Sequence, residues 1–223
     1  MSRSRFDPTF AELPRTLPIF PLAGALLLPG GRLPLNIFEP RYLAMTRDAL
    51  AGERLVGMVQ PLPGEASGPA EKTPPALYPL GCVGRIVAFS ETEDGRYHIV
   101  LSGLLRFDIA REIEGRGGYR QVEPDYRPYA ADLAPAADGA VERNALLEAL
   151  RGYFKRQGVD ADWKSLEGAG DERLVTTLAM ACPFEPSEQQ ALLAAPDLAA
   201  RAHVVMSLLE MATQGSDAGE ARH

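Results

Sequence analysis

Several residue types are scarce in this 223-residue chain, and each scarcity excludes a class of site. Lysine occurs only at positions 72, 155 and 164. Lys164 precedes Ser165 in a segment predicted to be exposed, whereas a Ser-Lys peptidase needs a desolvated lysine beside its nucleophile. The sequence also lacks a G-x-x-x-x-G-K-[ST] motif, so it has no phosphate-binding loop for a nucleoside triphosphate. We predict that the chain has no catalytic residues.

Cysteine and histidine are equally rare. Cys82 and Cys182 lie far apart and neither belongs to a C-x-x-C pair, which favours buried, reduced thiols over a disulfide or a zinc site. His98, His203 and His223 have no second histidine or carboxylate at the spacing of metal ligands. We therefore predict neither a metal nor a cofactor.

Positive charge and long apolar runs are also limited. The net charge is -7 and the pI is about 5.1, which disfavours binding to anionic membranes and to nucleic acid. The apolar run that starts at Leu17 is shorter than the roughly 20 residues that cross a bilayer, and prolines interrupt it. With no segment that resembles a secretory leader, a cytoplasmic protein without membrane contact is expected.

The most informative stretch runs from residue 17 to residue 42. Two apolar runs flank a turn at residues 29–32, and in the second run Leu33, Leu35 and Ile37 alternate with other residues at the period of a β-strand. Pro40 then stands where a helix can begin. We predict strands at 17–22, 33–38 and 55–60, a short helix at 40–51, and a mobile loop at 61–79.

The segment from 80 to 126 is predicted to contain only strands. Val83, Arg85, Val87 and Phe89 alternate along the first strand, and Asp94-Gly95 is expected to supply the positive φ angles of a tight hairpin. Further strands are predicted at 97–101, 104–113 and 119–126, the last two joined by a glycine-rich turn. Several short strands with tight turns indicate a closed or half-closed barrel.

Helical periodicity follows an Ala/Pro/Asp-rich linker. Apolar stripes begin near Leu146, Leu174 and Leu198, and Ser187 with Gln190 has the spacing of a capping box. The predicted organisation is a flexible segment (1–16), a β-rich unit (17–128), a linker (129–139), a helical unit (140–212) and a disordered tail (213–223).

Several motifs resemble those of one known family. The chain is similar to the substrate-binding domain found at the N-terminus of ATP-dependent Lon proteases, which also occurs as a free-standing protein. The resemblance covers residues 17 to about 212. The motifs that carry it are Leu17–Leu22, Leu28-Pro29-Gly30, Leu33-Pro34-Leu35, Ile37–Tyr42, Gly81–Gly84, Asp94–Arg96, Gly103–Phe107, Pro183-Phe184 and Gln189–Leu193.

The resemblance implies an α+β fold, with a β pseudo-barrel of the PUA type, one short helix, and a C-terminal helical bundle. It also implies a non-catalytic module that recognises exposed apolar or unfolded polypeptide, as an adaptor or quality-control factor. Any proteolysis would be supplied in trans, and the family's tendency to self-associate makes a homodimer a further hypothesis.

The leucines at positions 26 to 28 leave two hypotheses open. Neighbouring strand residues point to opposite faces, so burying all three requires cover on both sides. With such cover they belong to the core; without it they form an exposed apolar patch that marks an interaction site. Under the second hypothesis the peptide-binding residues are Leu26, Leu28, Pro29, Phe38 and Tyr42.

Two other functions are hypotheses that the sequence leaves open. Arg106, Arg111, Arg116, Arg120 and Arg127 follow one another, and PUA-type barrels often bind RNA, so an RNA-binding protein is the alternative. The simpler interpretation of these arginines is a solvated sheet edge. A small-molecule enzyme with a site assembled from scattered residues is the third hypothesis, although no constellation of residues supports it. The pair Glu39 and Arg41 is interpreted as an ion pair at the helix start.

Overall fold

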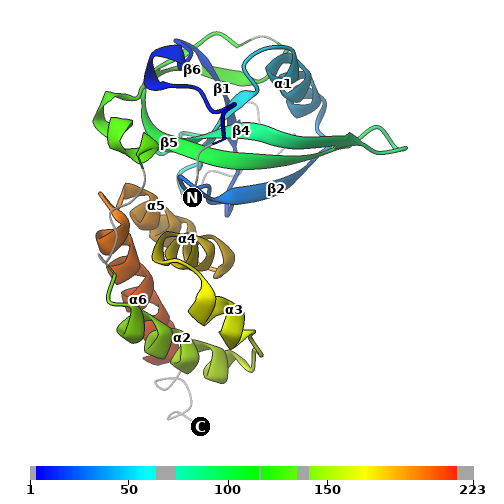
Figure 1. Cartoon of the computed structure of the whole chain (residues 1–223). Helices are drawn as coiled ribbons and strands as arrows, with labels where there is room; N and C mark the ends of the chain where they lie inside the picture. Colours follow the sequence, from blue (N-terminus) through cyan, green and yellow to red (C-terminus); the bar gives the residue numbers. More distant parts are fainter. Residues whose placement is uncertain (1–3, 64–73, 116, 135–140, 215–223) are drawn as a thin grey trace. The chain divides into compact units, whose positions relative to one another are not determined.

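The computed structural model describes residues 4–63, 74–115, 117–134 and 141–214. The chain divides into two compact units, Met1–Pro135 and Ala136–His223. The first contains the strands and the second contains helices (Figure 1). Parts of the predicted loop (64–73), linker (135–140) and tail (215–223) lie outside the described residues.

The first unit is built on a six-stranded mixed sheet. Its strands are β1 (Leu17–Pro21), β2 (Arg32–Ile37), β3 (Leu55–Val59), β4 (Leu80–Glu91), β5 (Tyr97–Ile113) and β6 (Arg120–Asp125). One α-helix, α1 (Pro40–Ala51), follows β2, and two short 3-10 helices, η1 (Phe10–Glu12) and η2 (Arg127–Leu133), flank the strands.

Five of these strands form a closed circuit of neighbours. β1 pairs with β3 in parallel, and antiparallel pairs link β3 to β4, β4 to β5, β5 to β6 and β6 back to β1. β2 stands outside the circuit and pairs with the beginning of β5. In a regular barrel each strand has two neighbours. Here β5 pairs with three strands, β2, β4 and β6, so the circuit is not a regular barrel. Together with the helices that follow, this mixed sheet confirms the predicted α+β fold with a β pseudo-barrel.

β5 is longer than the sequence indicated. Separate strands were predicted at 97–101 and 104–113, but β5 runs without a break from Tyr97 to Ile113. The Gly103 N–H donates to the carbonyl of Gly31 at 2.9 Å, and a Cβ on Gly103 would lie 2.0 Å from the Leu28 carbonyl oxygen. Because Gly103 has no side chain, the leucine segment can cross directly over β5 and the strand continues beneath it.

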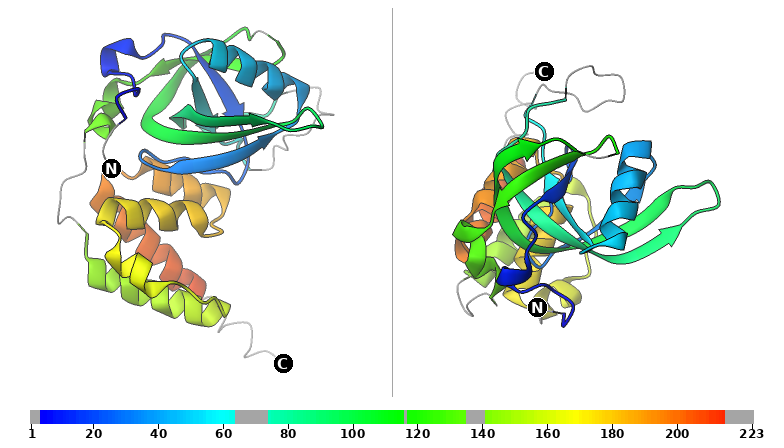
Figure 2. Two further views of the ribbon diagram at one scale, coloured as in Figure 1. Left: turned by 45° about the vertical axis from the view of Figure 1, so that its right-hand side comes forward. Right: turned by 90° about the horizontal axis from the view of Figure 1, so that it is seen from above.

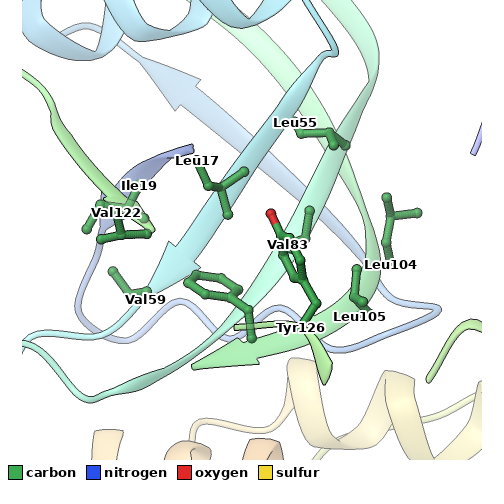
Figure 3. Packing of buried hydrophobic residues seen from close by; sticks show 10 residues of the cluster. Leu17, Ile19, Leu55, Val59, Val83, Leu104, Leu105, Val122 and Tyr126 are labelled. Atoms are coloured by element: carbon green, nitrogen blue, oxygen red, sulfur yellow. The ribbon is translucent and has the colours of Figure 1, made fainter. Parts of the chain in front are cut away.

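The core of this unit lies inside the circuit. Figure 3 shows the buried side chains of the cluster, which come from five strands and from the segment after β6. A Cβ on Gly57 or Gly81 would lie 2.7 Å from the Phe107 ring, so the ring occupies space that two glycines leave open. The buried residues of the cluster are Leu17, Ile19, Leu55, Val59, Val83, Leu104, Leu105, Phe107, Val122 and Tyr126.

The turn between β4 and β5 differs in detail from the prediction. Positive φ was expected at both Asp94 and Gly95, but only Gly95 has it, at 79°. The Thr92 N–H donates to the Arg96 carbonyl and the Gly95 N–H donates to the Thr92 carbonyl, both at 2.9 Å. This is a three-residue hairpin loop in which the glycine takes the left-handed position after a type I turn, so Asp94 keeps an ordinary conformation.

Side-chain contacts attach both ends of the first unit to the sheet. Asp132 of η2 accepts hydrogen bonds from Arg106 at Nη2 (2.7 Å), Nε (2.8 Å) and the backbone N–H (3.0 Å). Burial disfavours the charged guanidinium, but the bonds to Asp132 outweigh this and raise the pKa of Arg106. In the predicted flexible segment, Asp7 pairs with Arg85 of β4 at 2.8 Å.

The helix α1 agrees with the predicted range 40–51. Pro40 occupies its first turn, where no backbone N–H is needed. Tyr42, Met45 and Ala49 are buried on one face, as predicted.

The second unit consists, among its described residues, of five helices. They are α2 (Arg143–Gln157), α3 (Trp163–Gly168), α4 (Asp171–Ala181), α5 (Pro186–Ala194) and α6 (Leu198–Gln214). The predicted stripes are buried at Leu146, Leu174 and Leu198. The predicted capping box at Ser187 is wrong: the N-cap of α5 is Glu185, two residues earlier, with Glu188 completing the box, because Pro186 fits the first helical position.

We predict that Gly103→Ala destabilises the β unit, because the new Cβ cannot fit against the Leu28 carbonyl without moving backbone. The expected loss is about 2 to 4 kcal/mol, as for overpacking combined with broken ladder bonds. Hydrogen exchange across a urea series, which reports each unit separately, measures it. Gly152→Ala in α2 is the control, because its Cβ meets open space, and it should stabilise the helical unit by about 0.5 to 1 kcal/mol. Equal stability of Gly103→Ala and the parent chain would contradict the proposed close packing.

Candidate polypeptide-binding surface

The structure separates the five residues predicted to bind peptide. Leu26, Leu27 and Leu28 are at most 4% exposed, so they belong to the core and the alternative of an exposed leucine patch is wrong. Gly84 explains part of their cover, since a Cβ there would lie 2.8 Å from the Leu27 side chain. Leu27 and Leu28 thus lie close against β4 and β5 rather than at the surface.

The other predicted residues differ in exposure. Tyr42 is buried, with its ring 4.1 Å from the Phe20 ring between centroids, and burial raises its pKa. Pro29 is half-buried, whereas Phe38 is 62% exposed. Of the five predicted residues, only Phe38 therefore exposes most of its side chain to solvent. The peptide-binding role of these five residues stays a prediction.

Two of the exposed aromatic side chains, Phe38 and Phe89, lie next to or on a three-stranded arm, whereas Phe6 and Phe10 are exposed near the start of the chain. We define the arm as residues 32–37 of β2, 86–91 of β4 and 97–102 of β5, paired in the order β2-β5-β4. The ends of β4 and β5 project beyond the other strands (Figures 1 and 2). Phe38 follows the last residue of β2, and Phe89 of β4 is 44% exposed.

A β-bulge brings Phe89 to the apolar side of the arm. Phe89 lies opposite Ile99, which lies opposite Leu35, so these three side chains share one face. Along β4 the register shifts between Ile86 and Ala88, and one residue is skipped. The predicted alternation of Val83, Arg85, Val87 and Phe89 on one face is therefore wrong beyond Val87. The Phe89 ring also contacts Tyr97, with centroids 5.0 Å apart.

β2 forms an edge of the arm, since among the described residues it pairs only with β5. The Gly103 N–H bonds to the Gly31 carbonyl, and the antiparallel register continues without a shift to Ile37. Bonded and non-bonded pairs alternate in such a ladder, so Arg32, Pro34 and Asn36 direct their backbone groups outward. Pro34 has no N–H to offer at that edge, which limits strand addition there.

Charged groups near the arm and along β5 are largely paired. Arg41 contacts Glu39 at 2.8 Å at the start of α1, which confirms the predicted ion pair. Each described arginine of the predicted basic stretch has a carboxylate partner, and Arg116 lies outside the described residues. The pairs are Arg106–Asp132, Arg111–Glu123, Arg120–Glu112 and Arg127–Asp125. These partners offset the positive potential on which RNA binding depends, and no observation favours that alternative.

The described residues show no constellation suited to metal chemistry. Within them, no group of three or more His, Cys, Asp or Glu side chains is placed to hold a metal ion. His98 and His203 are exposed, and both cysteines are buried without a disulfide. No described helix combines the length and apolarity needed to span a membrane.

Comparison with known proteins agrees with the resemblance noted in the sequence. The family model of the ATP-dependent protease La (LON) substrate-binding domain matches residues 16–211. The chain belongs to this family. Lon protease 2 of Myxococcus xanthus is 28% identical over 209 residues, which cover 89% of this chain. Lon protease of Anaeromyxobacter dehalogenans is 31% identical over 103 residues.

Solved structures show the same fold for the Lon substrate-binding domain. A Lon N-terminal domain protein from Xanthomonas campestris has a TM-score of 0.60 at 24% identity and covers 86% of this chain and 97% of its own. The N-terminal domain of Mycobacterium avium complex Lon protease has a TM-score of 0.62 at 19% identity, covering 87% and 98%. The matched region is only 24% of the M. xanthus protease, so the activity of that whole protein does not transfer directly.

We predict that Pro34→Val converts the β2 edge into a site of self-association, because it restores an outward N–H and adds a β-branched side chain. Sedimentation velocity should show concentration-dependent dimers or larger species. Asn36→Val is the control, since it adds the same side chain at an outward position that already has its N–H. Equal self-association of both variants would show that hydrophobicity, rather than the missing donor of Pro34, is decisive.

We also predict that Cys182 of the native protein resists alkylation. Burial raises the pKa of its thiol to about 11, so at about pH 8 almost none is thiolate. Labelling with iodoacetamide, followed by peptide mass spectrometry, should be at least about 100-fold slower in the native protein than in urea. Comparable rates in the two conditions would contradict both the burial and the raised pKa.

Proposed function

We propose that this chain binds exposed apolar segments of unfolded or damaged polypeptides on the arm. The observation that carries the proposal is the exposure of two aromatic side chains at the two outer strands of one arm: Phe38, directly after β2, is 62% exposed, and Phe89 of β4 is 44% exposed. Large side chains of this kind are normally withdrawn from water, and where a surface keeps them exposed they commonly mark interaction sites.

The family supports polypeptide as the ligand, because its description is that of a substrate-binding domain in an ATP-dependent protease. The geometry supports an extended segment. The arm is a sheet with apolar side chains repeating every second residue, and an extended chain presents its own side chains at the same period. Half-buried Leu33 and Leu35 of β2 lie on the same face as Phe89, and Ile99 between Leu35 and Phe89 is buried.

The proposed role is that of a non-catalytic adaptor or quality-control factor in the cytoplasm. The chain would hold a client, and a protease supplied in trans would unfold and cut it. A homodimer would place two arms on one particle and raise the affinity for a long client through multivalency.

We predict that Phe38→Ser combined with Phe89→Ser weakens binding of a permanently unfolded model protein, reduced and carboxymethylated, by about 10-fold or more. Truncating an aromatic contact at an interface commonly costs one to two kcal/mol or more, about 1.4 kcal/mol being tenfold in affinity. Isothermal titration calorimetry measures the change, with each single variant tested separately to show which ring contributes.

The matched control is Val159→Ser combined with Met211→Ser, which removes exposed apolar side chains from the helical unit instead. This control should bind as the parent chain does. If the parent chain produces no heat with the unfolded protein, the proposed function fails. If the control variant loses binding and the Phe38/Phe89 variant does not, the site lies elsewhere.

A further inference from the structure

The tip of the arm carries negative charge that the described residues do not neutralise. Glu91 ends β4, Glu93 lies in the hairpin loop, and both are exposed. Among the described residues, neither forms an ion pair. Asp94, in the same loop, does have a partner: it contacts Arg96 at 2.9 Å. At the end of the arm, Glu91 and Glu93 therefore have no cationic partner within the described part of the chain.

Their position relative to Phe89 follows from the strand register. Phe89 lies opposite Ile99, and Glu91 lies opposite Tyr97, which is two residues along both strands. Side chains two residues apart share a face and are separated by about 7 Å along the strand. Glu91 thus follows the exposed aromatic ring on the same face, at the repeat distance of an extended polypeptide.

Cations close to this point are already engaged. Arg96 is paired with Asp94, and Arg41 beyond Phe38 is paired with Glu39. Arg32 is exposed, but it lies at the opposite end of β2, about 17 Å from Ile37 along the strand. The apolar surface near Phe89 is therefore bordered by negative potential at the tip, and the chain as a whole carries a net charge of -7.

We propose that the arm selects, among apolar polypeptide segments, those with a lysine or arginine next to the apolar stretch. This inference rests on the proposed function and specifies its substrate class. An extended segment with an apolar side chain on Phe89 would place its residue two positions further on beside Glu91. A basic residue there gains a charge pair, whereas an acidic residue meets a like charge.

The test uses three fluorescein-labelled peptides that share one apolar core and differ at the residue two positions from the central aromatic, which is Lys, Gln or Glu. Fluorescence anisotropy with the full chain gives the affinity of each. At low salt the Lys peptide should bind about 2- to 5-fold more tightly than the Gln peptide, and the Glu peptide more weakly, as for exposed charge pairs. The differences should shrink at high salt, because exposed charges are screened.

Variants locate the charge that is responsible. Glu91→Gln should reduce the difference in affinity between the Lys peptide and the Glu peptide. Glu91→Lys should reverse the order of the two affinities. Glu114→Gln is the matched control, because this substitution makes the same change in net charge. Glu114 is also exposed, and it follows the opposite end of β5. It should leave the peptide preference as it is in the parent chain.

The possible failures are distinguishable. If none of the three peptides binds, the proposed function itself fails. If all three bind equally at low salt, apolar binding stands and the selection for basic neighbours is overturned. If Glu114→Gln reduces the affinity difference between the Lys and Glu peptides as much as Glu91→Gln does, the preference for the Lys peptide comes from net charge. The assignment of this preference to the tip of the arm is then overturned.

Discussion

The β unit depends on the continuity of β5. This one strand pairs with β2 and β4 at its beginning, with β4 in its middle and with β6 at its end, so it closes the circuit and also supports the arm. That continuity depends in turn on Gly103, where the leucine segment approaches too closely for any side chain. Divided at Gly103, as the sequence suggested, the two halves of β5 would be linked only through β4, which pairs with both of them.

The same arrangement determines which apolar residues are buried and which remain exposed. Inside the circuit, Phe107 packs in a cluster of side chains from five strands, and Leu27 and Leu28 lie close against Gly84 and Gly103. Where β4 and β5 extend past the circuit, β2 pairs with β5, but residues 86–91 of β4 have no second strand partner among the described residues, and Phe89 keeps nearly half of its surface in water. The exposure of Phe89 at the arm is thus a geometric result of strand length, and it leaves the core of the circuit intact.

Local signals predicted much of the fold, but they predicted little of the surface. Pro40 and the spacing of Tyr42, Met45 and Ala49 were sufficient for α1, since capping and periodicity are properties of neighbouring residues. The bulge after Ile86 has no such signal: it depends on the pairing with β5, and it reverses the face on which Phe89 lies. Phe38 was included among the predicted site residues, whereas Phe89 was not, because its exposure depends on this non-local pairing.

The pairing of charges also depends on contacts between residues that are distant in the sequence. The arginines of 106–127 looked like a basic stretch in one dimension, yet strand pairing places Glu123 opposite Arg111 and η2 brings Asp132 to Arg106. A sheet thus combines charges that the sequence separates, and the potential at its surface follows from the residues left without a partner. Among the described residues, those include two glutamates at the tip of the arm, so the charge there is opposite in sign to the one that the arginine spacing suggested.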